Sequence, residues 1–262
     1  MLHRGAKHDL CWLWKADRSF FPHFCLRRLL PDITVKIFKV QAFLGRRRRT
    51  MSRDRGVLAV ISGFSGSGKG TVIKKMQELY PDRYRLSISA TTRDPRPGEE
   101  DKIHYFFITK EQFEELIDGG RLLEHAVYHE QYYGTPAAYV EENLAAGYDV
   151  ILEIEQQGAF QVKQAAPDSV LIFMSPPSAA ELERRLRGRN SEKEDDIAAR
   201  LAIAAKEACV IDRYDAFVVN EIPEECAVQV HEIIEAQKRK ICFNSQVIRS
   251  LQHDLWERFP QE

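Results

Sequence analysis

The stretch Val57-Leu-Ala-Val-Ile-Ser-Gly-Phe-Ser-Gly-Ser-Gly-Lys-Gly-Thr71 decides the fold of this 262-residue chain. Its first five residues form a continuous apolar run rich in β-branched side chains, which is typical of a strand buried on both faces of a parallel sheet. A glycine-rich turn follows, and residues 71–80 then repeat apolar side chains at helical spacing. The stretch therefore predicts a strand, a tight turn and a helix in succession.

The turn has the composition of a phosphate-binding loop. Its glycines let the backbone curl so that successive N–H groups face phosphate oxygens, and the following helix adds a partial positive charge. Lys69 adds a full charge directed at the β- and γ-phosphates of a nucleoside triphosphate. Gly70 replaces the usual Ser or Thr beside Mg²⁺, and the hydroxyl comes one residue later. The predicted ATP-binding residues are Gly63, Phe64, Ser65, Gly66, Ser67, Gly68, Lys69, Gly70 and Thr71.

The rest of the body alternates strand-like and helix-like segments. Apolar runs predict strands over residues 149–154, 170–174 and 216–219. Amphipathic spacing predicts helices over residues 139–146, 179–187, 197–208 and 224–241. This alternation predicts an α/β fold with a doubly wound parallel sheet. A proline- and aromatic-rich block from about residue 89 to 138 predicts a small inserted lobe with short strands of its own.

Charge is distributed unevenly along the chain. Residues 1–50 hold 12 Lys or Arg against three Asp, whereas the remaining 212 residues hold 26 basic and 36 acidic side chains. An acidic body argues against a general nucleic-acid binder. Five scattered cysteines without a CxxC pair argue against disulfides and a zinc site, and they suit the cytoplasm. No apolar run approaches the length of a membrane span, so we expect neither a nucleic-acid nor a membrane partner.

Residues 1–50 carry little of this pattern. They are rich in Arg and aromatic residues and end in four arginines just before Met51. The preferred interpretation is that Met51 is the natural start and that residues 1–50 are a mis-annotated or disordered extension. A transit peptide and a basic tail for an anionic surface stay open as alternatives.

Two arginines in the inserted block indicate a second anion site. Arg93 and Arg96 flank Pro95 in a segment that cannot be helical. Two guanidinium groups on a stiff loop suit a dianionic phosphate. Solvated loop arginines are the competing interpretation when these residues are taken alone.

The surrounding motifs resemble the guanylate kinase family over residues 56–240. The motifs are Ser89-Ala-Thr-Thr-Arg-Asp-Pro-Arg-Pro-Gly-Glu99, Tyr105, Gly119-Gly-Arg-Leu-Leu-Glu124, Tyr133-Gly-Thr135 and Leu152-Glu-Ile-Glu-Gln-Gln-Gly158. The resemblance implies transfer of the γ-phosphoryl group of ATP to GMP, and to dGMP. It also implies that GMP is bound by Ser89, Arg93, Arg96, Glu99, Tyr105, Glu124, Tyr133, Thr135 and Glu155.

Two acidic residues end the strand predicted over 149–154. Period two places Glu153 and Glu155 on one face at the carboxyl end, where ligands bind in open α/β sheets. The family usually has Asp in place of Glu155, so the contact of this longer side chain is open. We expect Mg²⁺ to be held by the nucleotide and by water near these carboxylates, with no direct protein ligand.

The resemblance also implies an arginine lid. Arg185 and Arg189 lie four residues apart, and Arg200 follows on the next helical segment. Glu181 can pair with Arg185, so an ordinary surface helix is the competing interpretation when these residues are taken alone. In the family, matching arginines close over the phosphates and act in catalysis with Lys69 and Arg93. Asn220 matches a residue near the adenine.

We predict a guanylate-kinase-like domain over residues 51–240. Its parts are a core of 56–88, 149–184 and 206–240, a GMP lobe of 89–140 and a lid of 185–205. Residues 242–262 predict an amphipathic helix that packs on its own chain, with packing on a second subunit of a homo-oligomer as the alternative. A non-catalytic binding module and a kinase of another phosphate acceptor are the competing functions.

Overall fold

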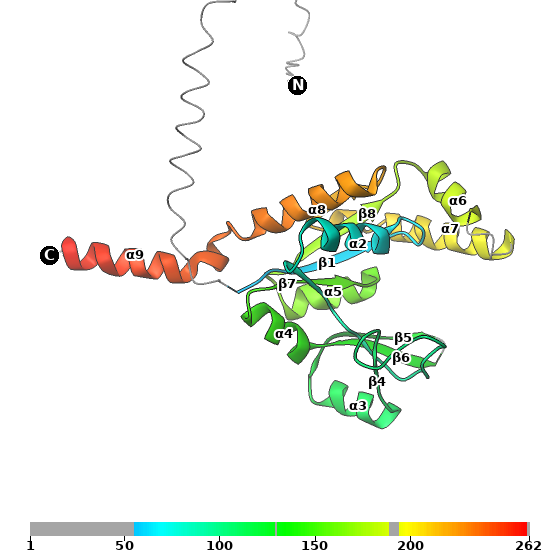
Figure 1. The fold of residues 1–262 in the computed structure, drawn as a ribbon, viewed down its shortest axis with the longest axis horizontal. Coiled ribbons are helices and arrows are strands. Elements are labelled where there is room, and N and C mark those ends of the chain that lie inside the picture. Colours follow the sequence, from blue (N-terminus) through cyan, green and yellow to red (C-terminus); the bar gives the residue numbers. More distant parts are fainter. Residues whose placement is uncertain (1–54, 129, 189–193, 261–262) are drawn as a thin grey trace, which may run out of the picture. The chain divides into compact units, whose positions relative to one another are not determined.

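A five-stranded parallel sheet forms the core of the computed structural model, which describes residues 55–128, 130–188 and 194–260 (Figure 1). All four strand pairs of this sheet are parallel. The strand order is β2 (Tyr84–Leu86), β7 (Asp149–Glu153), β1 (Leu58–Gly63), β8 (Val170–Ser175) and β9 (Ala216–Val219). The central position of β1 explains its unbroken apolar run, because residues 58–61 are buried on both faces.

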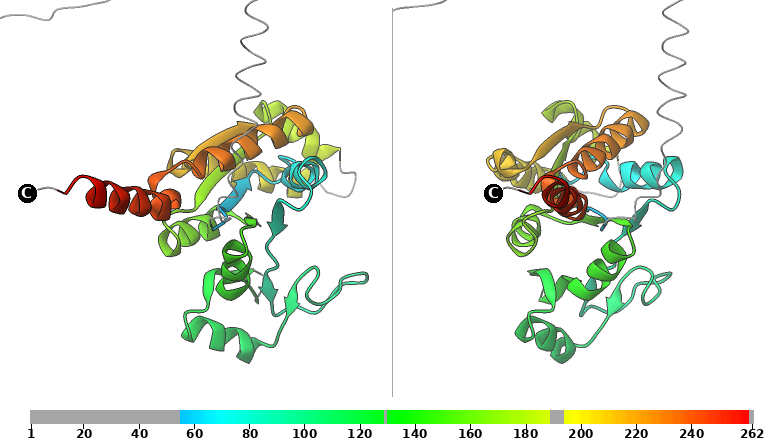
Figure 2. Two further views of the ribbon diagram at one scale, coloured as in Figure 1. Left: turned by 60° about the vertical axis from the view of Figure 1, so that its left-hand side comes forward. Right: turned by 90° about the vertical axis from the view of Figure 1, so that its left-hand side faces the viewer.

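Helices cover both faces of this sheet, as Figures 1 and 2 show. On one face α2 (Lys69–Leu79) and α8 (Pro223–Gln237) pack into a core with Ile61 and Ile172. On the other face α4 (Ala137–Ala145) and α5 (Gln156–Ala165) enclose a second core. The predicted doubly wound α/β fold is confirmed.

The inserted lobe has a four-stranded sheet of its own. Its order is β4 (Phe106–Phe107), β3 (Ala90–Thr91), β6 (Gln131–Pro136) and β5 (Leu122–Tyr128). Helix α3 (Lys110–Asp118) covers it with the fully buried Phe113. A capping box between Thr109 and Gln112 starts this helix, which the sequence analysis did not predict.

Two helices follow β8 and carry the predicted lid. Helix α6 (Ala179–Arg187) is capped by the Ser178 hydroxyl, and α7 (Glu194–Ala208) leads through η1 (Ile211–Arg213) into β9. Leu182 and Leu186 of α6 pack with Phe64 of the loop after β1. This contact joins the lid helices to the glycine-rich loop.

The chain ends in a second helical segment, η2 (Ile241–Asn244) and α9 (Ser245–Arg258). Helix α9 lies within the predicted range 242–262. Phe243, just before it, packs against the core of α2 and α8, whereas none of the residues of α9 is buried, so packing of α9 on its own chain stays a prediction. Its exposed apolar side chains are Val247, Leu251, Leu255 and Trp256. No helix in the described part of the chain has the length and apolarity needed to span a membrane. The predictions for residues 1–50 lie outside the described residues.

Candidate functional site

The glycine-rich loop between β1 and α2 adopts backbone conformations that depend on glycine. Gly66 and Gly68 have φ values of 90° and 88°, in the left-handed region that other L-residues rarely adopt. A side chain at Gly68 would also meet the amide nitrogen of Asn220, only 2.5 Å from the ideal Cβ position. The loop therefore has its predicted curl, and it leads directly into the N-terminus of α2.

Two side chains hydrogen-bond to the same backbone carbonyl of the loop. Asn220, which follows β9 and is buried, donates from Nδ2 to the Ser67 carbonyl at 2.7 Å. Arg185 of α6 donates to the same carbonyl at 3.3 Å and to the Asn220 carbonyl at 2.9 Å. Residues that the sequence places far apart, in the loop, the lid and the last strand, thus meet in one cluster.

Replacing Asn220 with Asp should weaken this cluster without changing its volume. The aspartate would face the Ser67 carbonyl with an acceptor, and the buried hydrogen bond would be lost. We expect the free energy of unfolding to fall by about 1–3 kcal/mol and the KM for ATP to rise. Urea denaturation and initial-rate kinetics measure the two effects. An unchanged KM for ATP would show that the hydrogen bond from Asn220 to the Ser67 carbonyl does not shape the loop.

Lys69 lies at the start of α2 with its ammonium group against the loop. Its Nζ donates to the Gly63 carbonyl at 2.8 Å and to the Phe64 carbonyl at 3.2 Å. Glu153, at the end of β7, faces the same helix start: its Oε2 lies 3.8 Å from the position a Cβ on Gly70 would take. Although Glu153 retains an exposed surface, desolvation raises its carboxyl pKa, and Lys69 lowers it to a smaller extent.

Glu155 does not belong to the strand. β7 ends at Glu153, and Glu155 is the residue that precedes the first turn of α5. The period-two argument that put both carboxylates on one strand face is therefore wrong for Glu155. Glu155 and Lys69 both act on the pKa of Glu207, which Glu155 raises and Lys69 lowers.

Two of the predicted lid arginines, Arg185 and Arg200, contact the glycine-rich loop from their own helices. Arg185 pairs with Glu181 at 2.7 Å, so the ordinary surface-helix pairing and the loop contact coexist. Arg184 and Arg185 together hold the pKa of Glu181 at about 2. Arg200 of α7 donates to the Ser65 hydroxyl at 2.9 Å. Arg189, the third predicted lid residue, lies outside the described residues.

A second cationic group lies in the inserted lobe. Arg93 makes a bidentate pair with Glu99 at 2.6 and 2.8 Å, and its guanidinium lies 5.0 Å from the centre of the Tyr105 ring. Glu99 raises the pKa of Arg93, with a smaller contribution from Tyr133, and the pKa of Glu99 falls to about 2. Tyr105 and Tyr133 meet edge to face with ring centres 6.2 Å apart. Three of the predicted phosphate-binding residues thus form one cluster.

Glu99 also orders the loop that carries the second arginine. Its Oε2 accepts from the backbone N–H of Arg96 at 2.8 Å. Ser89 precedes β3, and its carbonyl accepts from the N–H of Phe106 at 2.9 Å. Glu99 therefore orients the Arg93 guanidinium and the Arg96 backbone. Its motif alone did not indicate this supporting role.

A buried carboxylate lies between the lobe sheet and α5. Glu124 of β5 is 7% exposed, and its Oε1 accepts from the Thr135 hydroxyl of β6 at 2.7 Å. Burial raises the pKa of Glu124, and the hydrogen bonds from Thr135 oppose that effect. A buried carboxylate with one short neutral partner is suited to accept hydrogen bonds from a ligand.

The comparisons with known proteins agree with this geometry. A family model described as "Guanylate kinase" matches residues 55–237. The chain belongs to the guanylate kinase family. The resemblance seen in its motifs is therefore confirmed.

Individual guanylate kinases match over most of their length. The guanylate kinase of Clostridioides difficile is 46% identical over 187 residues, which cover 71% of this chain and 91% of the relative. That of Streptococcus pneumoniae strain R6 is 48% identical over 184 residues, covering 70% and 88%. A crystal structure of guanylate kinase from Anaplasma phagocytophilum aligns with a TM-score of 0.59 at 34% identity, covering 80% of this chain and 98% of that one.

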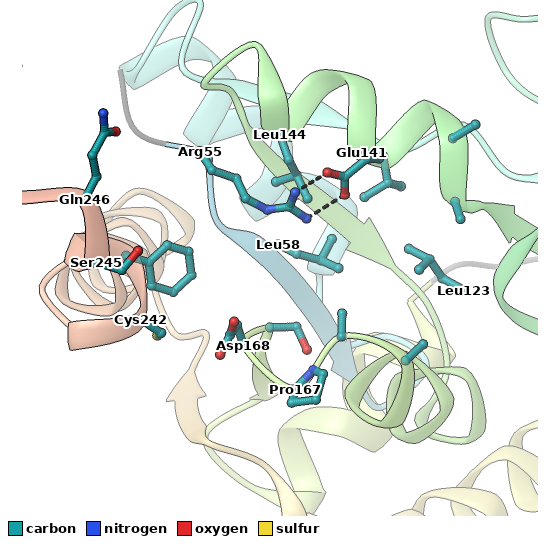
Figure 3. A pocket seen from close by; sticks show the side chains of 18 of the residues that line it. Arg55, Leu58, Leu123, Glu141, Leu144, Pro167, Asp168, Cys242, Ser245 and Gln246 are labelled. Atoms are coloured by element: carbon teal, nitrogen blue, oxygen red, sulfur yellow. Dashed lines mark hydrogen bonds and ion pairs between the residues drawn. The ribbon is translucent and has the colours of Figure 1, made fainter. Parts of the chain in front are cut away.

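A cavity of about 790 Å³ is lined by residues outside the glycine-rich loop, among them Leu58, Leu123 and Leu144 (Figure 3). It opens at the amino end of β1, the end opposite the glycine-rich loop, where Leu58 faces Leu144 of α4. Arg55 and Glu141 form an ion pair on its wall, and Cys242 and Ser245 line its far side. Ligands of open α/β sheets bind beyond the carboxyl ends of the strands, so we assign the chemistry to the loop.

Sequence reasoning missed the roles of two acidic residues, Glu181 and Glu207. Glu181 orients Arg185, although its spacing suggested only a surface pair. Glu207 of α7 has a pKa raised first by desolvation and then by Glu155, with Lys69 acting in the opposite direction. No motif signals Glu207, because its neighbours come from other parts of the chain.

Proposed function

We propose that this guanylate kinase transfers the γ-phosphoryl group of ATP to the 5′-phosphate of GMP, and of dGMP, giving ADP and GDP. The observation that carries the proposal is the buried carboxylate of Glu124. A carboxylate can accept from guanine N1–H and from the exocyclic amino group, and adenine lacks that pair of donors. A buried acceptor left unpaired by the wrong base discriminates strongly.

The ATP phosphates would lie in the curl of residues 63–71, against the N-terminus of α2. Lys69 would exchange its contacts with the Gly63 and Phe64 carbonyls for phosphate oxygens. Arg185 and Arg200 already contact the loop and would neutralise charge that develops during transfer. Asn220 supports the loop backbone, and we extend the lid role to Arg189.

The GMP phosphate would be held by Arg93 and Arg96 together with the hydroxyls of Tyr105 and Tyr133. Glu99 supports this group by fixing the guanidinium of Arg93 before the ligand arrives. Ser89 and Thr135 would complete the guanine pocket around Glu124. Glu155, at the start of α5, remains a proposed contact with the guanine amino group or with bound water.

No general base is needed for this transfer, because the acceptor phosphate is already an anion near neutral pH. The residues contribute by positioning the two phosphates in line and by neutralising their charge. Movement of the lobe toward the loop would exclude water and suppress hydrolysis of ATP.

Mg²⁺ is expected with ATP, where it screens the phosphate oxygens. The residues fit this cation, because the Glu153 carboxylate faces the helix start at Gly70, where a hydroxyl-bearing side chain is missing. Glu153 and Glu155 would hold water molecules of the hydrated ion.

A cytoplasmic location suits the three described cysteines, which are all free thiols.

A coupled assay across GMP, dGMP, AMP, UMP and ribose phosphates tests the proposal with purified full-length protein. We expect turnover with GMP and dGMP and little with the others. Absence of GMP turnover together with tight binding of a phosphopeptide would support the non-catalytic module instead. Turnover with AMP or a ribose phosphate alone would establish another acceptor.

A further inference from the structure

The helix α5 contains a glycine close to its N-terminus. Gly158 is the third residue of α5, in its first turn, and is buried. Its φ is not positive, so the backbone conformation does not require glycine there. Glycine also loses more conformational freedom on folding than any other residue. The absence of a side chain at this position therefore needs a reason outside the helix itself.

The reason lies in the inserted lobe. The Oε2 atom of Glu124 is 2.8 Å from the position that a Cβ on Gly158 would take, and its Cδ is 3.3 Å away. Real Cβ atoms essentially never approach another heavy atom so closely. The bare backbone of Gly158 is thus one wall of the space that the Glu124 carboxylate occupies, opposite the Thr135 hydroxyl on Oε1.

A second residue of the same helix fixes the strand that carries Glu124. The side-chain amide of Gln161 accepts from the His125 N–H and donates to the His125 carbonyl, both at 3.1 Å. β5 is an edge strand of the lobe sheet, so its outer backbone groups have no neighbouring strand. Gln161 satisfies them at one residue, and that residue is the next one after Glu124.

The hydrogen bonds between Gln161 and His125 lie where strand β5 is irregular. The pairing of β5 with β6 shifts register between Leu122 and His125, which brackets Glu124. Such irregularities re-aim a side chain and leave local backbone unpaired. Gln161 therefore supplies hydrogen bonds to β5 next to the point where the pairing of β5 with β6 is irregular.

We propose that Gly158 and Gln161 are positioning residues for base selectivity, which place the Glu124 carboxylate against the guanine edge from the core side. The proposal rests on the proposed function, in which Glu124 reads guanine. It adds that the base pocket of the lobe is completed by a helix of the ATP-binding core. Neither residue touches the base itself.

The decisive variant is Gly158→Ala, measured with GMP and with IMP, which keeps N1–H but lacks the exocyclic amino group. The new methyl group displaces Glu124, and a misplacement near 1 Å can lower a rate by about 100-fold. We expect kcat/KM for GMP to fall by about 10- to 100-fold, mainly through KM, with a smaller fall for IMP. The KM for ATP and the melting temperature should stay close to those of the wild type.

Gln161→Ala provides a second variant in case Gly158→Ala does not fold. Water can replace the amide at the half-buried His125 backbone, so the fold should persist while the GMP-to-IMP selectivity falls. Gln164→Ala is the matched control, because Gln164 is exposed on the same helix. It should leave both substrates unchanged.

A double-mutant cycle separates this proposal from a general structural effect. In a Glu124→Gln background, Gly158→Ala should cause no further loss of GMP selectivity, because its effect acts through Glu124. Additive losses, equal losses for GMP and IMP, or unchanged kinetics in both α5 variants would each overturn the proposal. Failure of the proposed function would show differently, as wild-type protein without GMP turnover or as Glu124→Gln without effect.

Discussion

Replacing Lys69 with alanine should lower kcat by about 10³-fold, while the KM for GMP changes little. Lys69 is the charged side chain at the phosphate loop that begins α2, and its Nζ already lies 2.8 Å from the Gly63 carbonyl. In the transition state it would face the phosphoryl group being transferred, where charge spreads over the equatorial oxygens. Steady-state kinetics with saturating ATP and GMP measure the loss.

The control is Lys74→Ala, which removes an equal charge from an exposed position on the same helix. It should retain wild-type kinetics, because surface charges are screened by solvent and salt. Thermal melting of Lys69→Ala tests whether losing the contacts to Gly63 and Phe64 disturbs the loop. Wild-type turnover by a folded Lys69→Ala protein would refute the proposed role of the loop.

Replacing Glu124 with glutamine should lower kcat/KM for GMP by at least about 100-fold. An amide presents one acceptor and one donor where the carboxylate presents two acceptors, so one guanine N–H group meets another donor. The glutamine oxygen can still accept from the Thr135 hydroxyl, which keeps the lobe packing intact. Isothermal titration with GMP and initial rates measure the loss of base recognition.

The stability of the Glu124→Gln variant should move in the opposite direction. Burial raises the pKa of Glu124, so folding favours the protonated carboxyl and the ionised group destabilises the folded state near neutral pH. The variant should therefore melt at or above the wild-type temperature at pH 7. The difference should shrink as the pH falls toward the ordinary range of a glutamate pKa. A lower melting temperature at pH 7 would instead indicate that the carboxylate supports the fold.

The core of this fold could be predicted because its signals are local. The buried strand, the glycines and the amphipathic helix of residues 57–80 follow one another without a gap, and β1 and α2 form there. The strand and helix predicted over 216–219 and 179–187 match β9 and α6 in their bounds. Period and turn chemistry alone specify such elements.

Helix α5 could not be predicted in the same way. It begins Gln-Gln-Gly directly after a strand, and polar residues next to a glycine are more typical of a loop. Its helical conformation depends on Ala159 and Val162, which pack against the sheet. Tertiary contacts therefore override the local preference in this segment.

The candidate site was predicted residue by residue but not in its connections. Arg93, Tyr105 and Tyr133 were grouped on their motifs, and they do lie together. The pairing of Gln161 with His125 joins residues 36 positions apart through backbone atoms, which carry no side-chain signal. Glu207 escaped notice for the same reason, since its neighbours come from other elements.

The hydrogen bonds from Asn220 and Arg185 to the Ser67 carbonyl orient the peptide unit that joins Ser67 to Gly68. A trans peptide unit is rigid and carries its C=O and N–H at opposite ends. Fixing the Ser67 oxygen toward the last strand therefore fixes the Gly68 hydrogen toward the other side, before any nucleotide arrives. The orientation of that dipole is established during folding, so ATP meets an oriented donor and need not reorganise the backbone to obtain one.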